Sequence, residues 1–141
     1  MASAVIAVDF DNTITKNGYP EVGEEILGAV AALKFMKERL DCAIVLWTCR
    51  NAKTHLIDAT YFCRQRGLDL DAINSNYEDM GDVCTPKIYA DIYIDDCSAE
   101  WVAESGGGPY TPEKWRRVLE GVIKYLGVEV QKEEIDELFN S

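Results

Sequence analysis

The stretch VIAVDFDNT at residues 5–13 decides the fold that the rest of the chain must complete. Its first four residues are apolar and mostly β-branched, and a polar turn follows, which is typical of a buried strand. Side chains alternate along a strand, so if Val8 and Phe10 face one side, Asp9 and Asp11 begin on the other, where the strand ends. Two acids at the carboxyl edge of an open α/β sheet favour a hard cation, usually Mg2+ when phosphate is the other ligand. An Asx-rich turn that only ends the strand is the alternative.

Length and composition indicate one globular domain. A chain of 141 residues, 48% of them hydrophobic, can bury a sizeable core and is unlike a disordered protein. It has no apolar run of membrane-spanning length, and Met1-Ala2-Ser3 leads into the first strand without a signal peptide. We therefore expect a cytoplasmic protein with no membrane partner. The formal net charge of −11 argues against a nucleic-acid partner, although a bound cation can still attract a small phosphorylated ligand.

The cysteines do not form a recognisable framework. They are odd in number and widely spaced, with no CxxC pair, which argues against both a disulfide scaffold and a zinc site. We expect reduced, mostly buried small residues at Cys42, Cys49, Cys63, Cys84 and Cys97.

Apolar runs alternate with helical patterns along the chain. After the first strand, further strands are expected at residues 42–47, 68–73 and 90–94, and helices at residues 21–39, 52–66 and 111–126. This alternation predicts a parallel sheet with right-handed crossovers. We expect an α/β fold, a three-layer α/β/α sandwich with a Rossmann-like sheet. It forms a single domain over residues 1–141, with its core at about 3–127 and a strand-and-helix tail at 128–141.

Polar side chains follow the strands at the points where they end. Thr48 follows the second strand, Asp95 and Asp96 follow the fourth, and Lys87 comes just before the fourth. The carboxyl ends of parallel strands meet at one edge, so these groups can converge with Asp9 on one site. Such a set suits phosphoryl transfer. One carboxylate attacks phosphorus, a second moves a proton, a hydroxyl and an ammonium bind phosphate oxygens, and further carboxylates hold Mg2+.

The four motifs resemble those of the haloacid dehalogenase superfamily of phosphohydrolases, in that family's chain order. Residues 9–13, DFDNT, look like its DxDxT motif, and residues 44–48, IVLWT, look like its apolar strand ending in Thr or Ser. Lys87 fits the lysine motif, and residues 93–96, YIDD, fit the strand ending in paired acids. The resemblance covers about the first two-thirds of the chain.

The resemblance implies a role for each of these residues. Asp9 would be the nucleophile and Asp11 the general acid and base. Thr48 and Lys87 would bind phosphate. Magnesium would be held by Asp9, the backbone carbonyl of Asp11, and Asp95, with Asp96 helping directly or through water.

The resemblance also narrows the reaction. Dehalogenases and cation-pumping ATPases of this superfamily lack an acid at the position of Asp11, so a phosphatase or a phosphomutase is expected. A mutase normally needs a cap to hold its bisphosphorylated intermediate, which favours a phosphatase that hydrolyses a phosphate monoester. The intervals where the family inserts caps are short here, which implies a capless or minimally capped member with no large cap domain. An open site would suit an exposed phosphoester, a phosphorylated small molecule, or a homo-oligomer whose partner covers the pocket.

Several residues near the expected site have two interpretations. Arg50 is either a contact for substrate or phosphate, or a helix-start surface arginine paired with an acid. His55 is expected at the surface, and Trp47 and Trp115 in the core. The remaining polar candidates are either substrate contacts or turn formers: Asn12, Asn17, Tyr19, Asn74, Asn76 and Asp82. Cys49 and Cys97 adjoin the site without a base beside them, so we expect no catalytic role for either.

Two other classes of protein stay open. A response-regulator receiver also combines acids, Thr, Lys and Mg2+, but its acid pair ends the first strand and its lysine comes last, whereas Lys87 precedes Asp95 and Asp96. A non-catalytic module that binds phosphate or Mg2+ on the same fold is the second alternative.

Overall fold

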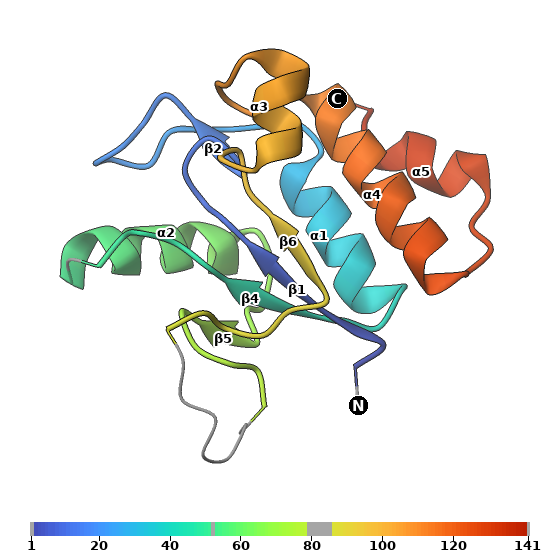
Figure 1. The fold of residues 1–141 in the computed structure, drawn as a ribbon, viewed down its shortest axis with the longest axis horizontal. Coiled ribbons are helices and arrows are strands. Elements are labelled where there is room, and N and C mark those ends of the chain that lie inside the picture. The colour runs from blue at the N-terminus through green and yellow to red at the C-terminus, as the bar shows by residue number, and fades with distance from the viewer. Residues whose placement is uncertain (1, 52, 79–85, 141) are drawn as a thin grey trace.

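A parallel four-stranded sheet forms the centre of the protein (Figure 1). The computed structural model describes residues 2–51, 53–78 and 86–140. The strand order is β5-β4-β1-β6, and every pairing in this sheet is parallel. The strands are β1 (Ala4–Val8), β4 (Cys42–Leu46), β5 (Ala72–Ile73) and β6 (Ile92–Ile94). The predicted α/β fold with a parallel Rossmann-like sheet is confirmed.

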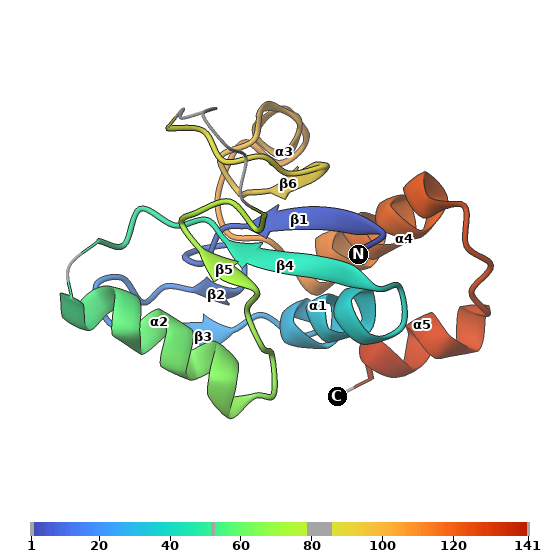
Figure 2. The same ribbon diagram turned by 90° about the horizontal axis from the view of Figure 1, so that it is seen from below.

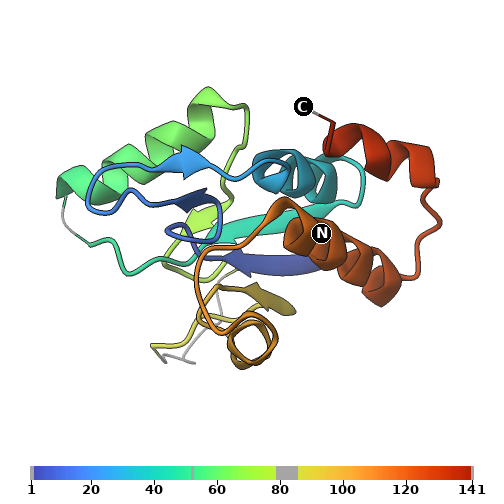
Figure 3. The same ribbon diagram turned by 90° about the horizontal axis from the view of Figure 1, so that it is seen from above.

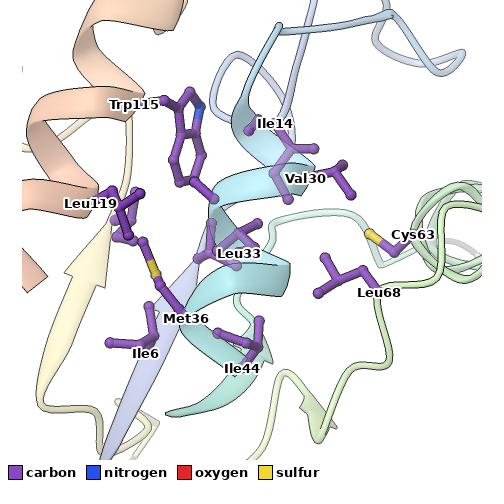
Figure 4. Packing of buried hydrophobic residues seen from close by; sticks show 14 of the residues in the cluster. Ile6, Ile14, Val30, Leu33, Met36, Ile44, Cys63, Leu68, Trp115 and Leu119 are labelled. Carbon is purple, nitrogen blue, oxygen red and sulfur yellow. The ribbon is translucent and has the colours of Figure 1, made fainter. Parts of the chain in front are cut away.

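The main core lies on one face of this sheet. Ile6 pairs in register with Ile44, and Val8 with Leu46, and all four side chains are buried in one cluster. The helices that supply the rest of this cluster include α1 (Ala29–Glu38), α2 (Lys53–Gln65) and α4 (Pro112–Leu126). Figure 4 shows the α1 side chains in the middle of this packing, with Trp115 and Leu119 of α4 on one side and Ile6 and Ile44 near the sheet.

The opposite face of the sheet is covered differently. A small cluster there joins Ala7 of β1 and Val45 of β4 to Ile88 and Ala90, which precede β6. No residue of a described helix belongs to this cluster. The predicted three-layer sandwich would have helices on this face. In the described part of the chain, the segment before β6 packs against this face instead.

The predicted helix at residues 21–39 is wrong in its first third. Residues 24–25 instead form β3 (Glu24–Glu25), which pairs antiparallel with β2 (Thr15–Lys16). The helix begins only after Gly28, whose φ of 90° is left-handed and stops the helical geometry from extending backwards. The chain between β1 and α1 is thus a β2–β3 hairpin, residues 15–25, that stands beside α2 (Figures 2 and 3).

The C-terminal third contains both a confirmed helix and a correction. α4 has the predicted N-cap, because the Thr111 side chain accepts a hydrogen bond from the Lys114 backbone, and Gly127 ends the helix with a φ of 68°. Two further helices are α3 (Ala99–Ser105) and α5 (Lys132–Leu138). α3 was not predicted from the sequence. It lies beyond β6 at the edge of the sheet opposite β5 (Figures 2 and 3).

Part of the expected tail at residues 128–141 packs into the folded core. Ile135 of α5 is 7% exposed and belongs to the main cluster, and Phe139 packs against it. The strand expected at residues 128–130 is not formed. None of the described helices has the length and apolar character needed to cross a bilayer.

Candidate active site

The carboxyl ends of β1, β4 and β6 meet at one edge of the sheet, as the sequence predicts. Val8 lies in register between Leu46 and Ile94. The ladder continues one step further, because the Asp9 backbone N–H donates to the carbonyl of Ile94 at 2.9 Å. Asp9, Thr48, Asp95 and Asp96 therefore follow directly on three adjacent strands. The convergence of these strand ends is a feature of the fold.

Thr13 connects the end of β1 to the end of β6. Its side chain is fully buried, and its hydroxyl oxygen lies 3.0 Å from an Asp9 carboxylate oxygen and 3.2 Å from one of Asp96. The same oxygen accepts a hydrogen bond from the Asp96 backbone N–H at 3.0 Å. Thr13 thus fixes Asp9 relative to Asp96. The sequence placed Thr13 in a motif but gave it no role.

The loop after β1 is held from outside by α4 and the segment before it. The Trp115 indole N–H donates to the Thr13 carbonyl at 2.7 Å, and the Tyr110 backbone N–H donates to the Asn12 carbonyl at 2.8 Å. Trp115 is a core residue, as predicted, but it also positions the loop that carries both acids. The sequence does not indicate this hydrogen bond, because the helical spacing of Trp115 predicts only that its side chain is buried.

Three carboxylates crowd together at this edge. The pKa of Asp9 is raised to about 8, mainly by burial, then by contact with the Asp96 side chain and by the charges of Asp95 and Asp96. The Thr13 hydroxyl opposes this shift. Burial also raises the pKa of Asp95, although the hydrogen bond from the Cys97 backbone opposes it. Among the described residues, no arginine forms an ion pair with any of these three acids.

This group of acids suits a cation. Ligand atoms of Asp95, Asp96 and Cys97 all lie within 4.8 Å of one another. Hard cations such as Mg2+ prefer carboxylate oxygens to a thiol. The charge of Asp96 raises the pKa of the Cys97 thiol. The donor set therefore fits an oxygen-liganded cation held by the carboxylates.

Asp11 lies in a different environment from Asp9. Its two oxygens accept hydrogen bonds from Arg50, from Nε at 2.8 Å and from Nη2 at 2.7 Å. Arg50 is only 1% exposed, and its guanidinium lies 5.2 Å from the centroids of the Phe10 and Tyr19 rings. Of its two interpretations, the structure shows the pairing with an acid. It corrects the expectation of a surface position, and it leaves the substrate contact without support.

The structure shows Thr48 and Lys87 in contact with other groups. The Thr48 backbone N–H donates to the Asn74 side chain at 2.8 Å, and the Thr48 hydroxyl accepts from the Arg50 backbone N–H at 3.1 Å. Lys87 is exposed, and its ammonium lies 5.0 Å from the centroid of the Tyr93 ring. A contact of Lys87 with phosphate at the Asp9 site stays a prediction.

The other candidates are mostly structural. Asn12 and Asn17 have positive φ values of 64° and 59°, as turn formers do. Asn76 accepts a hydrogen bond from the Tyr89 backbone at 2.7 Å. The backbone carbonyl of His55 accepts a hydrogen bond from Arg50. Cys49 and Cys97 are exposed free thiols. Asp82 and Cys84 lie outside the described residues.

Comparison with known proteins gives one informative similarity. No protein-family model matches the chain, and no curated protein matches it. Among solved structures, the chain is similar to a conserved protein from Bacteroides thetaiotaomicron, with 34% sequence identity and a TM-score of 0.71. The similarity covers 89% of this chain and 93% of the other.

Proposed function

The chain belongs to the same family as this conserved Bacteroides thetaiotaomicron protein, and from its own site we propose that it is a Mg2+-dependent phosphatase of the haloacid dehalogenase superfamily. It would hydrolyse a phosphate monoester through an aspartyl-phosphate on Asp9. The observation that carries the proposal is the crowding of Asp9, Asp95 and Asp96 beside Thr13 at the carboxyl edge of the sheet. Phosphoryl transfer through an aspartyl-phosphate needs a carboxylate nucleophile, and neighbouring cation ligands offset the charge that it meets.

The residues fit a magnesium ion for an electrostatic reason. Asp9 has a raised pKa because it is buried near two other acids, and a divalent cation would offset that repulsion. Asp9, Asp95 and the backbone carbonyl of Asp11 would hold the ion, with Asp96 close by. When bound, magnesium neutralises charge on the carboxylates and on the phosphate that approaches them.

Two half-reactions then follow from the residues. An Asp9 oxygen forms a bond to phosphorus while the bond from phosphorus to the leaving oxygen breaks, and Asp11 gives its proton to that oxygen. In the second half, Asp11 takes a proton from water, and the water oxygen displaces Asp9 from phosphorus. Asp9 is thereby released, and Asp11 is protonated again for the next cycle. Thr48 and Lys87 would bind phosphate oxygens.

The substrate and setting belong to the same proposal. The described residues form no large cap, which suits an exposed phosphoester or a phosphorylated small molecule, with a second copy of the chain as one way of covering the site. We keep a cytoplasmic setting in the proposal because Cys42, Cys49, Cys63 and Cys97 are free thiols.

The test is hydrolysis of p-nitrophenyl phosphate with Mg2+ and with EDTA. We expect Mg2+-dependent turnover by the wild type. Asp9→Asn should lose it, and Asp11→Asn should lower it by about 10²–10⁴-fold. Asp69→Asn, at an exposed acid away from the sheet edge, is the matched control.

The outcomes separate the open alternatives. Wild-type turnover that persists in Asp9→Asn would remove the nucleophile assignment. Binding of Mg2+ without turnover of any phosphate ester in a broad panel would favour the non-catalytic module. A stable phosphorylated Asp9 without release of phosphate would favour a receiver-like phospho-acceptor.

A further inference from the structure

Arg50 is a buried junction between three parts of the fold. Its guanidinium makes five hydrogen bonds. Two go to the Asp11 carboxylate. The others go to backbone carbonyls: Nη1 donates to Pro20 and His55 at 3.0 Å each, and Nη2 donates to Glu21 at 2.8 Å. An arginine side chain has five N–H donors, so all of them are used in this arrangement.

These partners belong to distinct elements. Asp11 follows β1, Pro20 and Glu21 lie in the β2–β3 hairpin, and His55 lies in the first turn of α2. The two hairpin carbonyls can both reach Arg50 only when the hairpin is seated against α2. The orientation of the guanidinium, and with it that of the Asp11 carboxylate, therefore depends on where the hairpin lies.

We propose that Arg50 is the positioning residue of Asp11 and that it makes the orientation of this acid depend on the β2–β3 hairpin. This inference rests on the proposed function, since it concerns how the acid of that reaction is held. It differs from a phosphate-binding role, because Arg50 has no donor left for a phosphate. A planar guanidinium suits this task, since it fixes the plane of the carboxylate as well as its distance.

The pairing is compatible with movement of a proton. When Asp11 gives a proton to the leaving oxygen and becomes a carboxylate, both of its oxygens can accept from Arg50, as the structure shows. When Asp11 carries the proton on one oxygen, the other oxygen still accepts from Arg50. Arg50 can therefore hold Asp11 in both states.

The experiment uses substrates that differ in their need for an acid. Phenyl phosphate needs a proton on its leaving oxygen, whereas 2,4-dinitrophenyl phosphate has a leaving group that departs as an anion. The ratio of kcat/KM values for the two esters measures the contribution of the general acid, because kcat/KM covers the steps up to the aspartyl-phosphate. We expect Arg50→Gln to lower kcat/KM for phenyl phosphate by about 10²-fold. The value for the dinitrophenyl ester should fall by less than about threefold, because a general-acid contribution is absent there.

Further variants distinguish loss of the positioning of Asp11 from an unspecific loss of activity. Arg50→Lys should restore part of the phenyl phosphate activity, since one amine can hold only one Asp11 oxygen well. Arg50→Gln combined with Asp11→Asn should be no slower than Asp11→Asn alone, because both changes remove the same function. Arg116→Gln, at a half-buried arginine on α4, controls for loss of an arginine and should keep the wild-type ratio.

The hairpin can be perturbed without touching Arg50 or Asp11. A Cβ at Gly23 would collide with the carbonyl oxygen of Lys16 across the hairpin, whereas a Cβ at Gly121 on α4 meets nothing. Gly23→Ala should therefore shift the ester ratio in the same direction as Arg50→Gln, by about tenfold, as expected for a displaced catalytic group. Gly121→Ala should leave it unchanged.

The outcomes distinguish this inference from the proposed function. If the wild type hydrolyses both esters but Arg50→Gln loses activity equally on both with a higher KM, Arg50 is a phosphate ligand or only a folding residue, and the inference is wrong. If Gly23→Ala keeps the wild-type ratio, the hairpin does not control Asp11. If the wild type hydrolyses neither ester, the proposed function fails. Amide hydrogen exchange at residues 15–25 then still tests the coupling, since Arg50→Lys should speed exchange there and Arg116→Gln should not.

Discussion

Asp9 and Asp11 lie two residues apart at one sheet edge but have opposite electrostatic surroundings. Asp11 accepts two hydrogen bonds from a buried guanidinium, which balances its charge. Asp9 lies with Asp95 and Asp96, and its pKa is raised to about 8. The loop after β1 therefore does not by itself determine the role of each acid. The side chains that follow β4 and β6 do so, by pairing one acid and crowding the other.

We expect the largest effect from removal of the ion pair between Arg50 and Asp11. Arg50→Met leaves a half-buried Asp11 charge and three backbone carbonyls without their donors: those of Pro20, Glu21 and His55. Loss of one partner of a buried ion pair costs about 3–5 kcal/mol. We expect the free energy of unfolding in urea to fall by this amount. Arg116→Met, at a more exposed pair with Asp136, should cost about 1 kcal/mol or less, and equal losses would contradict the distinction.

The carboxylate cluster of Asp9, Asp95 and Asp96 should make the stability of the protein depend on a bound cation. The proposed Mg2+ site exists only in the folded state, so Mg2+ should raise the free energy of unfolding by about 2.7 kcal/mol at a concentration 100 times its Kd. Asp95→Asn should remove most of this stabilisation, and the exposed Asp69→Asn should keep it. Thermal unfolding with Mg2+ and with EDTA measures the effect. An equal response of Asp95→Asn and the wild type would place the cation elsewhere.

The pH dependence of stability should also separate the two acids. The pKa of Asp9 is about 8 in the folded state and 3.8 in its ordinary state. Between these values the folded protein holds a proton that the unfolded chain has released, so without Mg2+ the stability falls as the pH rises. We expect a loss of at least about 1 kcal/mol between pH 5 and pH 8 in EDTA, and a smaller loss in Asp9→Asn. An identical slope in the two proteins would show that Asp9 does not titrate in this range.

The features predicted from the sequence are those that depend on regular periodicity. The apolar run before Asp9 and the alternation of strands and helices were enough to predict a parallel sheet, and its geometry brings Asp9, Asp95 and Asp96 together. The same reasoning gave α4, because Thr111 and Gly127 are strong end signals.

The missed features depend on contacts between distant segments. The hairpin strands are two residues long, too short for a periodic signal, while Val22 and Ile26 happen to be spaced as in a helix. The burial of Arg50 was also missed, because an arginine is ordinarily exposed and only the partners brought by the hairpin, α2 and β1 make its burial stable.

The smallest expected effect concerns the hydroxyl that joins the crowded acids. Thr13→Val keeps the shape of the buried side chain but leaves the Asp96 backbone N–H without its acceptor, at a cost of about 1 kcal/mol. The hydrogen bond from Thr13 lowers the pKa of Asp9, so its loss should raise that pKa further. In EDTA, the loss of stability with rising pH should therefore continue to a higher pH in Thr13→Val than in the wild type. Thr13→Ser keeps the hydroxyl and should follow the wild-type curve. A Thr13→Val curve with the wild-type pH dependence would show that Thr13 holds only the loop and does not act on Asp9.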